Sequence, residues 1–211
     1  PPSKVKRRKI GSASAGRVAL LHALAHIELN AIDLAWDIIA RFTHEELPRD
    51  FYDDWVQVAD EEAKHFDLLS NRLSDLGAAY GDLPAHDGLW QAAEATADDL
   101  LARLAVVPMV LEARGLDVTP AMIEKLRGVE DNASADILRI IYEEEIGHVT
   151  IGRRWFQWLC ERRGLEPLAT WQALVRERFR GPLKPPFNEA GRNEAGLPSD
   201  YYAPLVDRPD G

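Results

Sequence analysis

Two copies of the pattern Glu-x-x-His carry the chemistry that this sequence most clearly suggests. One copy pairs Glu62 with His65, and the other pairs Glu145 with His148. Residues three apart lie one turn apart on the same face of an α-helix, so each pair can present a carboxylate and an imidazole to a metal ion. Two further glutamates stand on other helix-like segments where an apolar residue is expected. The candidate metal ligands are therefore Glu28, Glu62, His65, Glu112, Glu145 and His148.

This set matches the ligands of a dinuclear carboxylate site in a four-helix bundle. In such bundles two helices each supply one Glu, and the other two each supply a Glu-x-x-His. Six protein ligands shared by two metals leave coordination positions open, which catalysis with dioxygen or water requires. Imidazole and carboxylate ligands without thiolate favour iron or manganese over zinc or copper. We expect two iron ions, with manganese or a mixed Mn/Fe pair as the alternative.

A single Glu-x-x-His is weak evidence for a metal site, because exposed helices are rich in Glu and a His often falls nearby. The register makes the pattern more informative, since the candidate ligands fall on apolar stripes with the spacing of a buried helix face. A buried carboxylate without a partner is very costly, and two divalent cations would supply a shared counter-charge. The stripes are Leu21, Leu24, Glu28, Ala31, Ala35 and Ile38; Phe51, Trp55, Val58, Glu62, His65 and Leu69; and Leu138, Ile141, Glu145, His148, Gly152, Trp155 and Leu159.

The elements that must position these residues are predicted to be helices, without strands. The separation between the lone Glu and the Glu-x-x-His is nearly the same in the two halves of the chain, with midpoints at residues 43–48 and near Gly128. A hairpin folded at each midpoint would bring its glutamates to the same height. The expected helices span residues 13–43, 48–76, 89–114, 119–127, 131–164 and 167–180, and no regular structure is expected from Gly181 onward because of its prolines.

Pro108 lies one turn before Glu112 inside the expected third helix. A proline in a helix removes a hydrogen bond and kinks the axis. The kink is either a tolerated irregularity or a device that opens the bundle beside the metals for substrate. The sequence does not choose between these two interpretations.

Composition limits the class of protein. The chain has 211 residues, of which 46% are hydrophobic, enough for one domain with a real core. A net charge of −10 argues against nucleic acid as a partner. No apolar run is expected to reach membrane-spanning length and there is no signal-peptide pattern, so we expect no membrane partner. Cys160 is the single cysteine, which favours a cytoplasmic protein without an intrachain disulfide, and we expect Cys160 to be buried.

Several other residues could contribute to a site. Tyr142 lies one turn before Glu145 and is our candidate catalytic residue, because a phenol beside an oxidising centre can donate a hydrogen bond or an electron. His22 and His26 share a helix face roughly opposite Glu28, so we expect them to pack or hydrogen-bond rather than bind metal. Three acidic residues are candidates for hydrogen bonds to the ligating histidines: Asp33, Asp60 and Glu61.

Five segments are informative together: 22–34 (HALAHIELNAIDL), 60–66 (DEEAKHF), 110–117 (VLEARGLD), 144–149 (EEIGHV) and 185–188 (PPFN). They resemble a bacterial ferritin-like family classed as a domain of unknown function. More distantly, the chain resembles the ferritin-like tRNA-modifying di-iron monooxygenase. The resemblance implies a ferritin-like four-helix bundle at residues 13–180 with the six ligands above. It implies no substrate. The basic cluster and the prolines separately predict a flexible basic tail at 1–12 and an extended C-terminal tail at 181–211 packed on the bundle.

Three hypotheses for function follow. The one we favour is an oxygen-dependent di-iron oxidase or oxygenase, with dioxygen and an unidentified small molecule as partners. The second is a ferroxidase or iron-handling protein without an organic substrate, and a store of this kind would need a cage-forming assembly. The third is a structural or interaction bundle that the metal only stabilises. Assembly as a homodimer is compatible with all but the cage.

Overall fold

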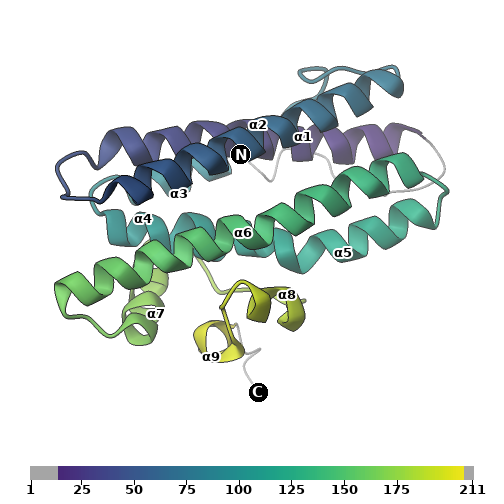
Figure 1. The fold of residues 1–211 in the computed structure, drawn as a ribbon. Coiled ribbons are helices and arrows are strands. Elements are labelled where there is room, and N and C mark those ends of the chain that lie inside the picture. Colours follow the sequence, from purple (N-terminus) through teal and green to yellow (C-terminus); the bar gives the residue numbers. More distant parts are fainter. Residues whose placement is uncertain (1–13, 207–211) are drawn as a thin grey trace. The chain divides into compact units, whose positions relative to one another are not determined.

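The protein is all-α over residues 14–206, which are the residues that the computed structural model describes (Figure 1). The expected basic tail lies outside this range. Within it, the only pairing of extended backbone is a parallel bridge between Leu183 and Val206. The elements are α1 (Ser14–Arg41), α2 (Arg49–Asp75), α3 (Gly88–Glu94), α4 (Leu100–Val106), the π-helix η2 (Val107–Glu112), α5 (Ala113–Arg127), α6 (Asn132–Arg163), α7 (Pro167–Arg178), α8 (Glu189–Glu194), α9 (Ser199–Tyr202) and the 3₁₀-helix η3 (Ala203–Leu205).

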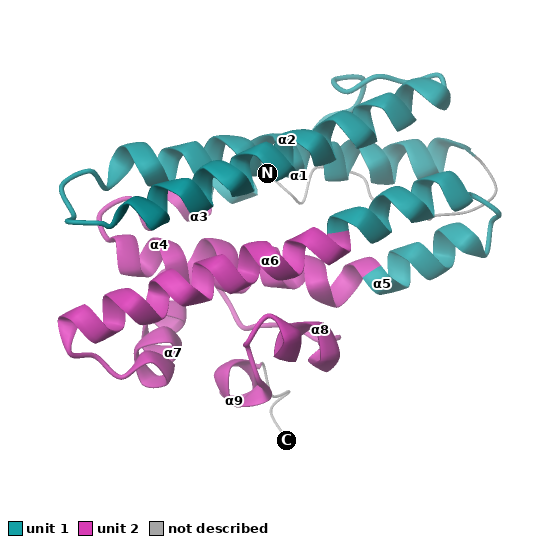
Figure 2. Cartoon of the chain, in the orientation of Figure 1, with its two compact units in different colours: residues 1–91, 120–141 teal, residues 92–119, 142–211 magenta. Residues whose placement is uncertain are grey.

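The chain divides into two compact units (Figure 2). Unit 1 comprises residues 1–91 and 120–141, and unit 2 comprises residues 92–119 and 142–211. The helices α5 and α6 each contribute residues to both units.

Unit 1 is organised around the expected first hairpin. Helices α1 and α2 pack side by side, and the chain reverses between Arg41 and Arg49, with Pro48 at the start of α2 as predicted (Figure 1). The first segment of unit 1 shares one apolar core with its second, formed by the end of α5 and the start of α6. This core comprises Leu21, Ala25, Leu69, Leu73, Ile123, Leu126, Ala135, Leu138 and Ile141.

Asp131 begins α6 and ties three helices of unit 1 together. Its carboxylate accepts a hydrogen bond from the Ser134 backbone N–H at 3.1 Å, and it accepts from Arg17 at 3.0 Å and Arg72 at 2.9 Å. Burial alone would raise the pKa of Asp131, but the hydrogen bonds from Ser134 and the two arginines outweigh it and lower this pKa. Asp131 thus both accepts from the first turn of α6 and serves as a buried anchor for α1 and α2.

Helix α1 is long and apolar enough, by length and composition, to cross a membrane. The expectation that no apolar run reaches membrane-spanning length is therefore wrong for residues 14–41 by these two criteria. A buried core helix passes the same test, and α1 contributes core residues such as Leu21 and Ala25 to unit 1.

The middle of the chain differs from the prediction of one helix at 89–114. A turn at residues 95–98 follows α3, and α4 then begins at Leu100. Asp99 is extended and its side chain accepts from the Leu101 backbone N–H at 3.1 Å, the arrangement of an N-cap. A new helix therefore begins where an uninterrupted one was expected.

Helix α5 runs without a break through the segment 115–118, where we expected an interruption. Pro120 cannot donate to the Leu116 carbonyl four residues earlier. Asn188 replaces that donor, since its side-chain nitrogen lies 3.1 Å from the Leu116 oxygen. A residue far along the chain thus satisfies the carbonyl that the proline leaves without its helical partner.

The segment after Gly181 is more regular than expected. It contains the short helices α8, α9 and η3 within unit 2. Asn188 caps α8 by accepting from the Gly191 backbone N–H at 3.2 Å, and Pro198 precedes α9. Buried side chains hold this segment in place, among them Arg192, Leu197 and Tyr202. Helix α7 ends at Arg178, two residues before the predicted end.

Candidate metal centre

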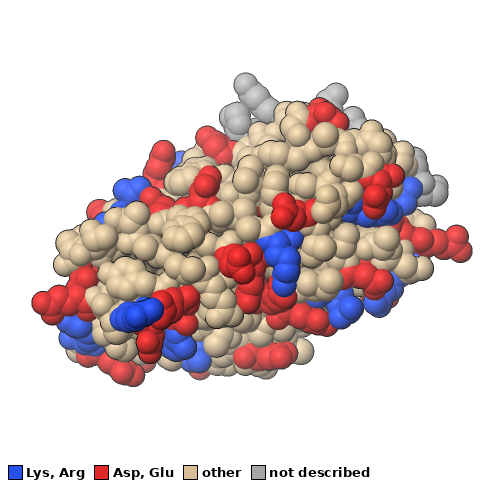
Figure 3. Space-filling model, turned by 45° about the horizontal axis from the view of Figure 1, so that its top comes forward, with Lys and Arg blue, Asp and Glu red and all other residues tan. Residues whose placement is uncertain are grey.

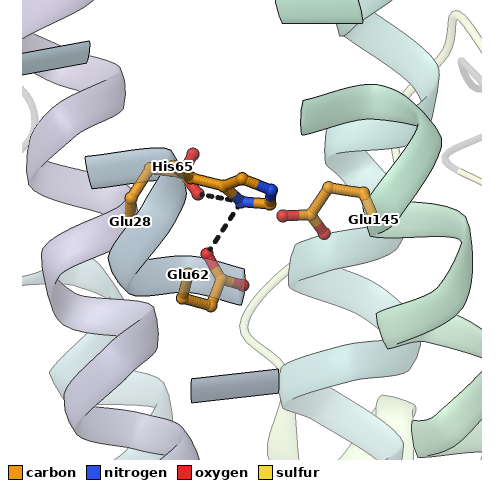
Figure 4. A group of neighbouring side chains, drawn as sticks. All are labelled: Glu28, Glu62, His65 and Glu145. Carbon is orange, nitrogen blue, oxygen red and sulfur yellow. Dashed lines mark hydrogen bonds and ion pairs between the residues drawn. The ribbon is translucent and has the colours of Figure 1, made fainter. Parts of the chain in front are cut away.

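The first half of the candidate site lies entirely within unit 1 (Figure 4). Glu28 comes from α1, and Glu62 and His65 come from α2. The His65 Nδ1 lies 3.2 Å from a Glu28 carboxylate oxygen and 3.4 Å from a Glu62 oxygen. Each residue offers one ligand atom, and these atoms lie within 4.8 Å of one another. Two carboxylates and an imidazole are thus gathered at one point.

The apolar stripes explain how unit 1 brings these three side chains together. Glu28 is 4% exposed, and Glu62 and His65 are fully buried. On α2, Val58 lies one turn before Glu62 and Leu69 one turn after His65, and both are buried. Burial of these flanking apolar residues places this face of the helix in the core, and Glu62 and His65 are buried because they lie on the same face.

The charge state of His65 follows from its two carboxylate neighbours. Burial alone would lower the pKa of His65, but its hydrogen bonds and charge interactions with Glu28 and Glu62 outweigh burial and raise the pKa to about 10. The metal-free protein therefore carries a protonated imidazole at neutral pH. The Nδ1 of His65 faces the two carboxylates and carries a proton toward them. The same Nδ1 is the atom that would bind a metal ion.

The second half of the candidate site lies within unit 2. Both residues of its Glu-x-x-His are on α6, and the His148 Nδ1 lies 3.7 Å from a Glu145 carboxylate oxygen. His148 is fully buried and Glu145 is 9% exposed. The pair repeats the arrangement of Glu62 and His65 one turn apart.

Glu112 differs from the other five candidate ligands because it is only partly buried. It is the last residue of η2, a π-helical turn that begins at Val107. Pro108 lacks the N–H of a regular helix, and its ring clashes with the carbonyl of an α-helical turn. The wider π turn relieves this conflict. Such turns occur frequently at functional sites.

Gly152 accommodates Pro108 within unit 2. A Cβ added at Gly152 would overlap the Cβ and Cγ of the proline ring. This position of α6 therefore accepts only glycine without rearrangement. Sequence analysis placed Gly152 on the apolar stripe and predicted a kink at Pro108, but it did not connect the two residues.

Tyr142 contacts the C-terminal segment of unit 2. Its hydroxyl accepts a hydrogen bond from the Asn188 side-chain nitrogen at 2.9 Å. A Cβ on Gly191 would collide with this hydroxyl, so the helix α8 approaches it closely. The role of Tyr142 in catalysis stays a prediction.

The remaining candidates have contacts away from the ligands. As expected for a packing role, His22 accepts from the Gly81 backbone N–H at 3.0 Å, and the His26 ring is 2.8 Å from the Tyr80 hydroxyl. Asp33 and Asp60 are exposed, and Glu61 accepts from Gln57 at 3.0 Å. None of these contacts reaches a ligating histidine.

Cys160 is fully buried, as predicted. Burial raises the pKa of its thiol to about 11. The thiol is therefore protonated at neutral pH and has little nucleophilic character.

A buried ion pair in unit 2 was not predicted from the sequence. Arg192 donates to both carboxylate oxygens of Asp117, each at 2.7 Å, and its guanidinium lies 5.1 Å from the Phe187 ring and 4.6 Å from the Tyr202 ring. Asp117 also accepts from the Asn188 backbone N–H at 3.0 Å. No local pattern joins residues so far apart in the chain, and only the resemblance at residues 110–117 and 185–188 pointed to either segment.

The chain is similar to known proteins over nearly its whole length. The sequence profile of a family described as "Protein of unknown function (DUF455)" matches residues 1–203. A Haemophilus influenzae protein described as "Uncharacterized protein" is 44% identical over 201 residues, which cover 93% of this chain and 69% of that relative. No solved structure matches the chain.

Proposed function

The chain belongs to the DUF455 family of proteins of unknown function. From that premise we propose that it is a dinuclear metal protein with iron as the native metal. In this proposal the protein uses dioxygen to oxidise a small organic substrate. The observation that carries the proposal is the buried group of Glu28, Glu62 and His65, which could hold a metal ion. Two carboxylates and an imidazole without thiolate are the donor types of iron and manganese sites.

The fit of the donors to a cation rests on burial and charge. Burying two carboxylates beside one imidazole is costly unless a positive charge accompanies them. In the metal-free protein, a proton on His65 provides part of that charge. A divalent cation would take over this role while His65 becomes neutral and Glu28 and Glu62 stay ionised. The same donor types recur at Glu145 and His148.

We take the two halves as ligands of one dinuclear centre because of the ligand pattern. One Glu from each of two helices and one Glu-x-x-His from each of two others is the set used by ferritin-like di-metal bundles. The first half here is Glu28 with Glu62 and His65, and the second is Glu112 with Glu145 and His148. A ferritin-like arrangement of the four helices is part of this proposal.

The residues of the chain and the metal would have separate tasks. When bound, two ferrous ions supply the electrons for the reduction of dioxygen, and the protein supplies ligation, dryness and shape. Glu62 and His65 are fully buried, which excludes bulk water from that side of the site. Glu112 ends the π turn and is partly exposed as a residue, although its Oε2 is buried.

Two other functions use the same ligands. A ferroxidase would oxidise ferrous iron without an organic substrate, and a structural bundle would bind metal without any reaction with dioxygen. The burial of Glu28, Glu62 and His65 does not favour the ferroxidase over the structural bundle, or the reverse. The pocket in unit 2 described below favours an enzyme with an organic substrate.

The test is a reaction of anaerobically reconstituted ferrous protein with oxygenated buffer. We expect iron oxidation, followed by stopped-flow absorbance, and dioxygen uptake, followed with an oxygen electrode, to be complete within minutes. Glu62→Gln is the comparison, because it keeps the size of a buried ligand and removes its charge. Iron that binds but stays ferrous over this time would refute both the oxidase and the ferroxidase functions and leave the structural one.

A further inference from the structure

Unit 2 contains a pocket of about 290 Å³ whose lining is mainly apolar. Val110 and Leu111 of the π-helix η2 form part of one wall, and Phe179 and Leu183 form other parts. Leu111 immediately precedes Glu112, so the pocket wall and a candidate ligand belong to the same turn. The volume is at the lower end of the range for ligand pockets and suits a small ligand.

The charge of the pocket is opposite to that of the protein. The chain carries a net charge of −10, and acidic and basic groups are interspersed on the face that Figure 3 shows. The pocket, by contrast, is lined by one carboxylate, Asp117, and by four cationic side chains. These are Arg114, Arg180, Lys184 and Arg192.

The cationic side chains are arranged at two depths. Arg192 is 3% exposed and is held by its bidentate ion pair with Asp117, which uses its Nε and Nη2 and leaves Nη1 outside that pair. Arg114 is anchored by donating to the Lys184 and Pro186 carbonyls at 2.7 and 2.8 Å. Arg180 and Lys184 are exposed at the rim. An anionic group can therefore meet cations both on entry and in the interior.

We propose that this pocket binds a small organic acid with an apolar body, a carboxylate or a phosphate ester. The apolar wall takes the body of the ligand, and the cationic side chains select its negative charge. That the pocket serves the metal centre as its substrate site rests on the proposed function, whereas the binding itself does not.

The experiment measures binding of 2-naphthoate to the full chain by isothermal titration calorimetry, in metal-free and in iron-loaded protein. The neutral analogue 2-naphthylmethanol has the same ring without the charge, and 2-naphthyl phosphate replaces the carboxylate by a phosphate. We expect at least one of the anions to bind, and the neutral analogue to bind at least tenfold more weakly. Equal binding of the neutral analogue, or no anion binding at millimolar concentration, would overturn the proposal.

A pair of double variants locates the binding. Arg180→Gln with Lys184→Gln removes two exposed charges at the pocket rim, and Lys125→Gln with Arg127→Gln removes two exposed charges on α5 in unit 1. Both double variants change the net charge equally and affect exposed side chains. We expect the first to weaken binding by about tenfold and the second to leave it unchanged. Equal weakening by both would show non-specific attraction and refute the pocket.

The two proposals can fail separately. Naphthoate binding that depends on the pocket charges, in a protein that takes up no dioxygen, would support the pocket and remove the oxidase function. Dioxygen uptake without pocket-dependent binding would have the opposite meaning.

Discussion

At the scale of single residues, the position of a glutamate on its helix decides whether it can serve as a metal ligand. Glu61 and Glu62 are neighbours in the chain, but Glu62 is fully buried against His65 whereas Glu61 is partly exposed and contacts Gln57. Consecutive residues on a helix do not share a face. Chemically identical side chains therefore have different functions in the proposed centre.

We predict that Glu62→Gln lowers the affinity for Mn²⁺ by at least about tenfold, because even residues that only support metal ligands cost this much when changed. Glu61→Gln is the matched control and should have little effect. Mn²⁺ titration followed by electron paramagnetic resonance measures both. Similar losses from the two variants would mean that the helical phase assigned to the ligands is wrong. The same comparison applies to Glu145→Gln against Glu144→Gln.

The raised pKa of His65 predicts a pH dependence of metal binding. A metal requires the neutral imidazole, so it must displace the proton that His65 holds up to a pH of about 10. The apparent Mn²⁺ affinity should rise between pH 6.5 and 8.5, by up to about tenfold per pH unit for each proton released. Calorimetric titration in buffers of different ionisation enthalpy counts these protons. Affinity independent of pH would show that His65 is not protonated or not a ligand.

The raised pKa of His65 also makes the stability of the metal-free protein depend on pH. This stability falls as the pH rises, whereas the metal affinity increases. The folded pKa of His65 lies above the unfolded value of about 6.5. Its contribution to the free energy of unfolding is therefore fully present below that pH and is lost as the pH rises through about 10. High pH thus weakens the empty protein while it favours metal binding.

At the scale of elements, the π-helix η2 depends on a glycine in α6. Pro108 prevents a regular α-helical turn, and the resulting π turn ends at Glu112 and forms part of the pocket wall at Leu111. Gly152 leaves the space that the proline ring fills. The position of a candidate ligand therefore depends on a close contact between two elements of unit 2.

Two glycines of α6 should respond in opposite directions to replacement by alanine. Gly152→Ala places a methyl group against Pro108, and we expect a loss of about 1–3 kcal/mol in the free energy of unfolding, typical of overpacking. Gly147→Ala meets no atom within 4 Å and should add about 0.5–1 kcal/mol from helix propensity. Urea denaturation of the metal-free proteins measures both changes. If both alanines stabilise, the close contact with Pro108 does not exist in solution.

At the scale of the whole molecule, the two half-sites of the proposed centre belong to different units of the chain. Each unit contains one Glu-x-x-His, and the helices α5 and α6 run through both units. The ligand pattern favours a single dinuclear site.

We predict that the protein binds two Mn²⁺ ions per chain and that these two ions are magnetically coupled. Bridging carboxylates hold the ions of a dinuclear centre close together, so electron paramagnetic resonance should show the spectrum of a coupled pair. Elemental analysis gives the stoichiometry, and Glu62→Gln should reduce occupancy of both positions. Two uncoupled ions would indicate separate mononuclear sites in the two units. Metal removal should lower the melting temperature in either case.

The spacing of residues in the sequence was sufficient to predict the features that arise within one helix or one hairpin. The burial of Glu28, Glu62 and His65, the turn before Pro48 and the start of α6 at Asp131 all follow from helical periodicity and capping. These features depend on neighbours within a turn or across a short reversal, so a local pattern contains the information that determines them. The bundle as a whole and the metal itself stay predictions.

Contacts between segments far apart in the chain determine the features that were not predicted from the sequence. The turn before Asp99 and the π turn at Pro108 divide the expected third helix, and Asn188 allows α5 to continue through Pro120 by donating to the Leu116 carbonyl. The pair of Asp117 and Arg192 joins α5 to a segment that we expected to be irregular, and together with Lys184 it gives the pocket its charge. Only the tertiary structure determines such features, because each depends on a hydrogen bond, ion pair or steric contact whose partners are far apart in the chain.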